Sequence, residues 1–276
     1  MNTLEKPTSS FFPWLGGSLV VVGLVIALEQ RLHTGWLILA LLPAFGILLL
    51  SAGWRKKSMA WILPGLLIIG LGLGLLLGYS PIFKMAWMDQ LGALLITFAA
   101  GWVAIGVVPV MFHKNFSWWA FIPAGIIGGA GVAFAFTPLR FLDFILYPCM
   151  GLGIALLLWG IMAHLFGLII SGALVFTTGP AIYMGWINPG QPLSQTGVML
   201  VILALGWILI TVFSRAVTHK FVWWPLIPGG VLGMVGWGLY IGGNPGNAIS
   251  FIGNTGSVAL IILGIYLLLI RRGMRQ

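Results

Sequence analysis

The chain has 276 residues, of which 60% are hydrophobic and only 6% are charged, with 13 Lys and Arg against 4 Asp and Glu. An ordinary soluble domain carries about 25% charged residues, so this chain lacks the polar side chains that a water-facing surface needs. The composition excludes an ordinary soluble globular protein and predicts an integral membrane protein whose apolar surface faces lipid. The single cysteine, Cys149, excludes an internal disulfide framework and a cysteine-based metal site.

The chain begins with a weakly charged segment, residues 1–10, that leads into a long apolar run ending at Leu28. A cleaved signal peptide would need a short apolar core followed by a small-residue cleavage site. Here the run is followed by Glu29, Gln30 and Arg31. We therefore expect a retained membrane-spanning helix at residues 12–28.

Nine further apolar segments follow, each close to the roughly 20 residues that a helix needs to cross a bilayer. Charged, Pro/Asn-rich or turn-like positions bound them. The division near His164 is the least marked, because residues 144–185 are continuously apolar, too long for one span and too short for three. The predicted spans are residues 12–28, 36–53, 59–78, 91–111, 118–136, 144–163, 166–185, 197–213, 222–241 and 255–270.

These segments have the pattern of helices rather than strands. Residues 259–270, for example, are apolar on every side, whereas the strands of a membrane barrel alternate apolar and polar residues. The sequence predicts an all-α polytopic membrane bundle of about ten helices. We expect it to form a single transmembrane domain over residues 1–276.

The charges are distributed unequally between alternate connections. One set of connections, with the two terminal tails, holds ten cations: Lys6, Arg55, Lys56, Lys57, Lys114, Arg215, Lys220, Arg271, Arg272 and Arg275. The other set holds three cations, each near an acid: Arg31 near Glu29, Lys84 near Asp89 and Arg140 near Asp143. Cytoplasmic connections are enriched in Lys and Arg, so both termini are predicted to be cytoplasmic. Cations scattered over short loops do not form a nucleic-acid-binding patch, although they attract anionic lipid headgroups.

Three predicted helices open alike, with tryptophan followed by proline and glycine, at residues 61–65, 118–125 and 223–230. Looser copies begin at Phe12 and Leu168. This pattern predicts a tandem two-helix repeat. Because every copy of a two-helix unit enters the membrane from the same side, the repeat differs from the inverted repeats of many secondary transporters.

Glycines recur at four-residue spacing within the repeated helices. Small residues at this spacing form a groove that a neighbouring helix can approach closely. We predict a packing role for them, and contact between exposed backbone and a ligand or ion is the alternative. The predicted packing glycines are Gly70, Gly74, Gly78, Gly125, Gly129, Gly229 and Gly233.

The chain carries little recognisable chemistry. No ionisable residue is predicted at mid-membrane, where transporters and proton relays place them. The three acids near the outer span ends are expected to pair with neighbouring cations or to meet water. No Ser-His-Asp, HExxH or CxxC pattern is present. We predict neither an enzyme nor a metal or cofactor site.

The chain has four histidines: His33, His113, His164 and His219. His113 and His219 occupy the same repeat position, each followed by Lys, and we expect both to be solvated at the interface. His164 lies at the predicted tight cytoplasmic turn. It could ligate a metal or a pigment, but no partner ligand lies at helical spacing.

The seventh predicted span departs most from the repeat. It lacks the Trp-Pro opening and carries Thr177 and Thr178 shortly before Pro180. Proline in a helix frees backbone carbonyls, and threonine hydroxyls can satisfy backbone groups again. One interpretation is a kink packed against neighbouring helices, and the other is a polar lining for a small cavity. The candidate lining residues are Ser171, Thr177, Thr178 and His164.

Residues 259–272, and more loosely residues 223–230, resemble the helices of the LiaI/LiaF-type transmembrane region of bacterial envelope proteins. The resemblance covers about 15–20 residues at each place. It implies a bacterial cytoplasmic-membrane protein that modulates envelope-stress signalling. LiaF-type proteins also carry a soluble domain, and this chain has no segment that would form one.

From these features we expect a non-enzymatic multi-pass protein of the cytoplasmic membrane, acting as a scaffold or accessory subunit through membrane-protein partners or a second copy of itself. Two alternatives remain open. One is a carrier or channel for a small uncharged or weakly polar solute, which the irregular seventh span favours. The other is an accessory subunit that binds lipid or pigment, which the histidines, tryptophans and glycine grooves permit.

Overall fold

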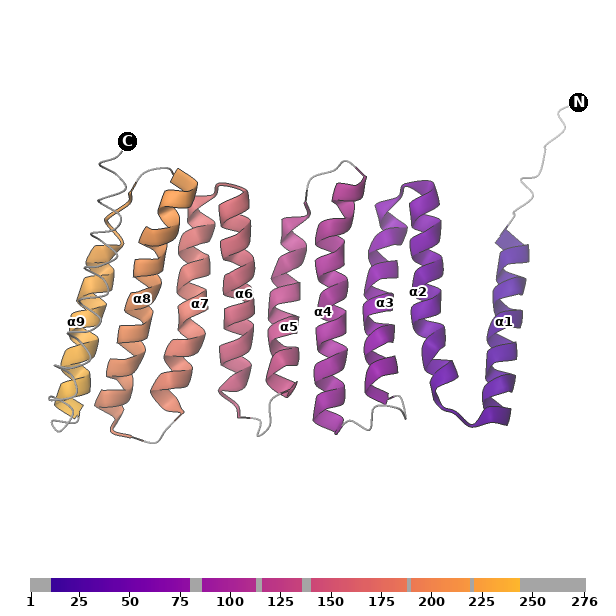
Figure 1. Cartoon of the computed structure of the whole chain (residues 1–276), viewed down its shortest axis with the longest axis horizontal. Helices are drawn as coiled ribbons and strands as arrows, with labels where there is room; N and C mark the ends of the chain where they lie inside the picture. The colour runs from indigo at the N-terminus through magenta and orange to yellow at the C-terminus, as the bar shows by residue number, and fades with distance from the viewer. Residues whose placement is uncertain are drawn as a thin grey trace, which may run out of the picture. The chain divides into compact units, whose positions relative to one another are not determined.

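The computed structural model describes residues 11–79, 86–112, 116–135, 140–187, 190–218 and 221–243. These ranges contain nine α-helices and no β-strand (Figure 1). The chain divides into two compact units, unit 1 at residues 1–139 and unit 2 at residues 140–276. The helices of unit 1 are α1 (Phe11–Leu32), α2 (Trp36–Lys56), α3 (Met59–Tyr79), α4 (Trp87–Met111) and α5 (Phe121–Ala135), the last preceded by the 3₁₀ turn η2 (Trp118–Ala120). Those of unit 2 are α6 (Asp143–Met162), α7 (Phe166–Trp186), α8 (Pro192–Thr218) and α9 (Leu226–Gly243).

Within the described residues, eight helices are long and apolar enough to cross a membrane: α2, α3, α4, the η2–α5 segment and α6 to α9. The predicted multi-pass helical membrane protein is therefore confirmed in its class. The division at His164 is also correct, because α6 ends at Met162 and α7 begins at Phe166. The predicted span 12–28 forms α1, which is not among these eight. The predicted span 255–270 lies outside the described residues, so the count of ten stays a prediction. The single transmembrane domain likewise stays a prediction.

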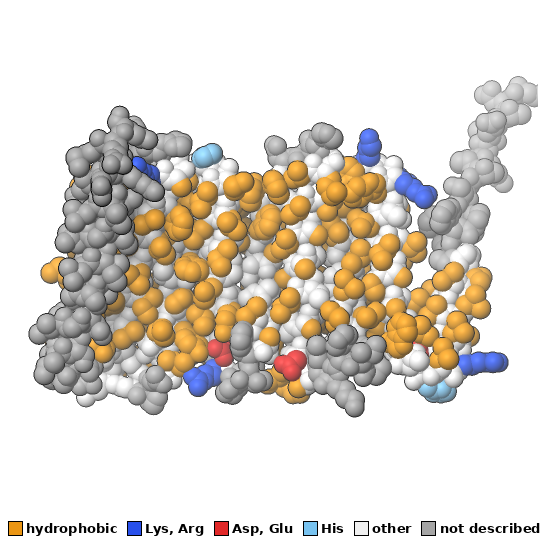
Figure 2. Space-filling view, in the orientation of Figure 1, with side chains coloured by type: hydrophobic (Ala, Val, Ile, Leu, Met, Phe, Trp, Pro, Cys, Tyr) orange, Lys and Arg blue, Asp and Glu red, His pale blue; other side chains and the backbone are white. Residues whose placement is uncertain are grey.

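Aromatic side chains mark the two ends of α3. Trp61 and Tyr79 are both about half exposed. The rise of about 1.5 Å per residue places them about 27 Å apart along the helix axis, close to the roughly 30 Å thickness of the bilayer hydrocarbon. Hydrophobic side chains fill the middle of the visible face, and the visible charged side chains lie near helix ends (Figure 2). This is the distribution expected of helices that cross lipid.

In unit 1 the helices form a single row, in which each packs mainly against its neighbours in the chain: α2 on α3, α3 on α4 and α4 on α5 (Figure 1). Glycines bring the backbones together on both sides of α3. A Cβ added to Gly65 would lie 2.9 Å from the Leu50 amide nitrogen of α2. A Cβ added to Gly70 would lie 2.7 Å from the Thr97 carbonyl oxygen of α4. Both seams therefore leave no room for a side chain.

The remaining two sides of α3 stay open. Pro64 and Leu73 are nine positions apart, which at about 3.6 residues per turn places them on opposite sides of the helix. Both are exposed. No more than 33% of the residues in any of the eight candidate spans are buried. A row of this kind has lateral seams but no enclosed interior.

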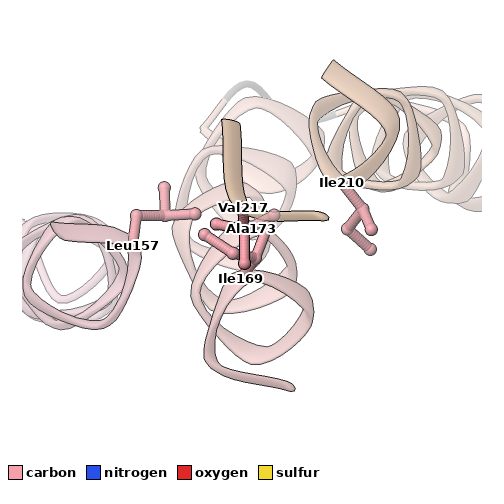
Figure 3. Packing of buried hydrophobic residues seen from close by; sticks show 5 residues of the cluster. All are labelled: Leu157, Ile169, Ala173, Ile210 and Val217. Atoms are coloured by element: carbon pink, nitrogen blue, oxygen red, sulfur yellow. The ribbon is translucent and has the colours of Figure 1, made fainter. Parts of the chain in front are cut away.

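Unit 2 is built in the same way, with α6 on α7, α7 on α8 and α8 on α9. Its principal apolar cluster joins α6, α7 and α8 (Figure 3). Leu157 of α6 meets Ile169 and Ala173 of α7, with Ile210 and Val217 contributed by α8. Ile169, Ala173 and Ile210 are completely buried. This cluster is the described core of the unit.

The two units use equivalent contacts, helix for helix. Gly53 faces Ile62 across the α2–α3 seam, and Gly160 faces Ile169 across the α6–α7 seam. Gly92 faces the Ala135 amide on α5, and Gly197 faces the Tyr240 amide on α9. Two edge-to-face tryptophan pairs, Trp102–Trp119 and Trp207–Trp224, are spaced 5.7 and 6.0 Å between ring centres. The correspondence therefore relates α2–α5 to α6–α9, four helices to four, and the two-helix repeat stays a prediction.

Candidate functional site

The hydroxyl groups of α7 are turned to the backbone of their own helix. Ser171 donates to the carbonyls of Gly167 and Leu168, both at 3.2 Å. Thr178 donates to Leu174 at 2.7 Å. This is the usual back-bonding of Ser and Thr within a helix. The hydroxyl protons of Ser171 and Thr178 are therefore already donated to backbone carbonyls and are not free for a solute.

Thr177 is the most enclosed of these residues, at 5% exposure. Its hydroxyl donates to the Ala173 carbonyl at 3.0 Å and to the Leu174 carbonyl at 3.2 Å. The same oxygen fills the space beside Gly206 of α8, where an added Cβ would collide with it. The structure therefore places Thr177 at a helix seam. This geometry favours the packed-kink interpretation of α7 over a polar cavity lining.

His164 forms the turn between α6 and α7. Its φ of 53° lies in the left-handed region, and the Leu165 amide closes the turn by donating to Gly160 at 2.9 Å. This is the six-to-one bond of a Schellman-type helix end. Within the described part of the chain, no group of three or more His, Cys, Asp and Glu is placed to hold a metal ion. The structure thus assigns His164 a turn-forming position and does not bring it together with the α7 hydroxyls.

Most of the predicted packing glycines lie at helix contacts. A Cβ added to Gly74 would lie 2.6 Å from Leu94 Cα, and one on Gly78 would lie 3.2 Å from the Gln90 carbonyl oxygen. Gly229 is tight against Trp207, with 2.9 Å to its Cβ, whereas Gly233 has ordinary clearance. Gly129 is buried and Gly125 is half-buried. Gly70, Gly74 and Gly78 therefore lie on the α3–α4 seam and Gly229 on the α8–α9 seam, whereas Gly125 and Gly129 belong to α5.

A second set of glycines was missed by the sequence reading. It lies on the α2–α3 and α6–α7 seams, where spacing of seven residues rather than four hides it from a search for four-residue grooves. Aligning residues 36–79 with 143–186 reveals the set, because these glycines coincide. Its members are Gly46, Gly53, Gly65, Gly72, Gly153, Gly160, Gly172 and Gly179.

Glu29 is the other feature that the sequence reading placed differently. It lies at the end of α1, just beyond the apolar run, and is 7% exposed. Its carboxylate accepts the Thr34 hydroxyl at 2.9 Å, the Gly35 amide, and the Leu37 amide at 3.2 Å. The carboxylate thus caps the start of α2, satisfying amides that have no partner inside the helix. We expected this acid to pair with a neighbouring cation or to meet water, and the contacts of its carboxylate are those of a helix cap.

The cap also sets the protonation behaviour of Glu29. Burial acts to raise the pKa of this carboxyl, and the hydrogen bonds from Gly35, Thr34 and Leu37 lower it by more. The pKa therefore lies below its ordinary value, and Glu29 is charged at neutral pH.

The other two acids of the described residues, Asp89 and Asp143, lie at helix starts. Asp143 opens α6 and accepts the Arg140 amide at 2.8 Å, and Asp89 is in the first turn of α4. A negative charge is favourable at the positive end of a helix dipole. The three acids of the described residues are therefore explained as helix-end groups.

Among the described residues, unit 2 holds more buried hydroxyls than unit 1. On α8, Thr211 is 3% exposed and Ser214 is completely buried. Ser214 donates to the Thr211 carbonyl at 2.7 Å, whereas the Thr211 hydroxyl has no hydrogen-bond partner within the described structure. The positions equivalent to these two in unit 1 are Gly106 and Pro109. This polar enrichment distinguishes the second set of four helices from the first.

Comparison of the chain with protein-family models, with curated proteins and with solved structures gave no match in any of the three.

Proposed function

We propose that this chain is a non-enzymatic scaffold or accessory subunit that binds other membrane proteins, or a second copy of itself, laterally within the bilayer. The observation that carries the proposal is the row architecture. In each unit, neighbouring helices pack backbone to backbone at glycine, as Gly65 and Gly70 show for α3. The free surface that remains is the broad apolar face of the row.

The interior of the spans supports the same proposal. Between their end turns, the eight candidate spans carry no Asp, Glu, Lys, Arg or His. Ionisable groups within the membrane are the usual mark of ion or proton pathways. Surfaces that bind neighbouring helices rely instead on close packing of small and apolar residues.

For location, we propose a cytoplasmic membrane with both chain ends on the cytoplasmic side. The support is the charge distribution along the chain. Cations end α2 and lie in the last turn of α8: Arg55, Lys56, Lys57 and Arg215. Acids lie near the end of α1 and in the first turns of α4 and α6: Glu29, Asp89 and Asp143. The likeness to LiaI/LiaF-type helices supports a bacterial envelope setting for the same role.

Isolation of the untreated full-length protein in lipid nanodiscs, without prior detergent extraction, tests the scaffold proposal. Particle mass and protein content should show a second polypeptide or a homo-oligomer. A single copy per particle with no companion protein would contradict the proposal.

A carrier for a small, weakly polar solute is the second candidate, and the buried hydroxyls of unit 2 favour it. Thr211 supplies a buried hydroxyl without a partner in the described structure, and Thr177 lies on the neighbouring helix. Solute flux into proteoliposomes that is lost in both Thr211→Val and Thr177→Val would support the carrier. Absence of flux across a broad solute panel would remove this candidate.

A further inference from the structure

The connection between α2 and α3 presents three consecutive cations, Arg55, Lys56 and Lys57, which we name the basic turn. All three are exposed. α2 ends at Lys56 and α3 begins at Met59, and both helices are long and apolar enough to span a membrane. Because only two residues separate the two spans, the basic turn is held at the level of the lipid headgroups.

The basic turn has a fixed backbone. Lys57 lies in the left-handed region with φ 48° and ψ 33°. The Ser58 amide donates to the Gly53 carbonyl at 3.0 Å, and the Lys57 amide donates to the Trp54 carbonyl at 3.2 Å. These bonds close a Schellman-type end on α2. The three side chains therefore leave the helix end from a defined geometry.

Two tryptophans, Trp54 and Trp61, lie close to the basic turn in the sequence. The Lys56 ammonium lies 5.7 Å from the centre of the Trp61 ring, within cation–π range. Trp54 packs on Phe112 of unit 1 with 4.9 Å between ring centres. Both tryptophans are nearly half exposed, and tryptophan favours the membrane interface. No Asp or Glu occurs between Leu37 and Met88 in the sequence, so no acid in this stretch competes for the cations.

The equivalent turn of unit 2 shows that the cations are not needed to build this structure. Met162, Ala163 and His164 occupy the three positions. His164 has the same left-handed conformation, and the Leu165 amide closes the same bond to Gly160 at 2.9 Å. The turn therefore folds without Lys or Arg, so the backbone geometry does not require the three charges of unit 1.

We propose that the basic turn is a binding site for the headgroup of an anionic phospholipid. A phosphate accepts paired hydrogen bonds from the Arg55 guanidinium and single ones from lysine ammonium groups. Juxtamembrane cations are drawn to anionic lipid at the membrane surface. This proposal gives the chain a lipid ligand. It does not depend on whether the broad apolar faces bind another protein.

The two turns supply a matched experiment. In R55M/K56A/K57H the basic turn receives the residues that already form the unit 2 turn, so the fold should be kept. Native mass spectrometry of the full chain, titrated with phosphatidylglycerol and separately with phosphatidylcholine, measures binding. Loss of three surface cations should weaken phosphatidylglycerol binding by about 100-fold, since each contributes on the order of 1 kcal/mol and 1.4 kcal/mol corresponds to a tenfold change in affinity. Phosphatidylcholine binding should not change.

The reciprocal variant, M162R/A163K/H164K, should gain a second phosphatidylglycerol site of similar strength. Thermal unfolding of each variant checks that the fold persists, and R55Q/K56Q/K57Q replaces the first variant if that one does not fold. Unchanged phosphatidylglycerol binding in the charge-loss variant overturns the proposal. So does equal wild-type affinity for phosphatidylcholine, or preferential binding of an oligoglutamate peptide at this turn with no binding of the anionic lipid.

Discussion

At the scale of single residues, glycine decides how close two spans approach. A Cβ added to Gly153 would lie 2.6 Å from the Phe176 amide nitrogen, whereas one added to Gly167 would meet nothing within 4 Å. Backbone atoms cannot yield as a flexible side chain can, so the first site is intolerant and the second is tolerant. The sequence alone does not distinguish them, because both glycines stand in continuously apolar helices.

Gly153→Ala should therefore destabilise the protein by about 1–3 kcal/mol, the usual cost of overpacking a close contact. Gly167→Ala should leave stability unchanged or slightly raised, because alanine has the higher helix propensity. Thermal unfolding in one detergent compares the two variants. Equal effects would show that α6 and α7 do not meet at Gly153.

Glu29 gives a prediction about pH. Its folded-state pKa is lowered, so the cap on α2 contributes stability above the unfolded-state pKa and is lost as pH falls through the folded-state pKa. The protection of the Gly35 and Leu37 amides against hydrogen exchange, relative to the intrinsic exchange rate at each pH, should fall on acidification below the ordinary Glu range. Glu29→Gln should exchange faster at neutral pH and show no such acid step. A Glu29→Gln protein with the wild-type pH profile would refute the cap.

At the scale of whole elements, the sequence predicts the existence and order of the spans well and their ends less well. The predicted span 197–213 corresponds to α8, which runs from Pro192 to Thr218. Hydropathy reports the apolar thickness that a segment can cross, whereas a helix continues for a turn or more into the polar interface. Residues such as Gln195 and Thr218 are helical for that reason, although they look like loop residues in the sequence.

Which helices touch, and through which atoms, is predicted only in part. The four-residue glycine rows identify the α3–α4 seam through Gly70 and Gly74. The α7 hydroxyls suggest either a kink or a cavity. Deciding between these two interpretations requires knowing that Thr177 lies against Gly206 of the next helix, α8. Such a long-range pairing cannot be read from local spacing.

The α7–α8 seam can be tested by complementary changes. Gly206→Ala should destabilise the protein, because the new methyl would collide with the Thr177 hydroxyl. Thr177→Ala removes that group and should restore most of the loss, giving a non-additive pair with a coupling of about 0.5–3 kcal/mol. Thr177→Val alone should cost about 1 kcal/mol or less, since polar contacts in membrane helices average well below that. Strictly additive effects would contradict the seam.

At the scale of the whole molecule, the account depends on helices that cross a bilayer repeatedly and pack in rows. The predicted fold class follows from composition, and the equivalence of α2–α5 with α6–α9 follows from matched contacts such as Trp102–Trp119 and Trp207–Trp224. The Trp-Pro openings predict a two-helix unit, which stays a prediction, whereas the contacts relate four helices to four. The four-helix correspondence became visible only when the partners of each glycine were known.

Side-specific labelling of single cysteines tests the central claim most directly. Cys149→Ala gives a cysteine-free background, in which Ser58→Cys reports the α2–α3 turn and Phe141→Cys, at an 80% exposed position, reports the segment before α6. Three candidate spans, α3, α4 and η2–α5, separate the two positions. A membrane-impermeant thiol reagent should therefore reach Ser58→Cys and Phe141→Cys from opposite sides of sealed vesicles. Labelling of both from the same side would contradict the membrane-spanning arrangement.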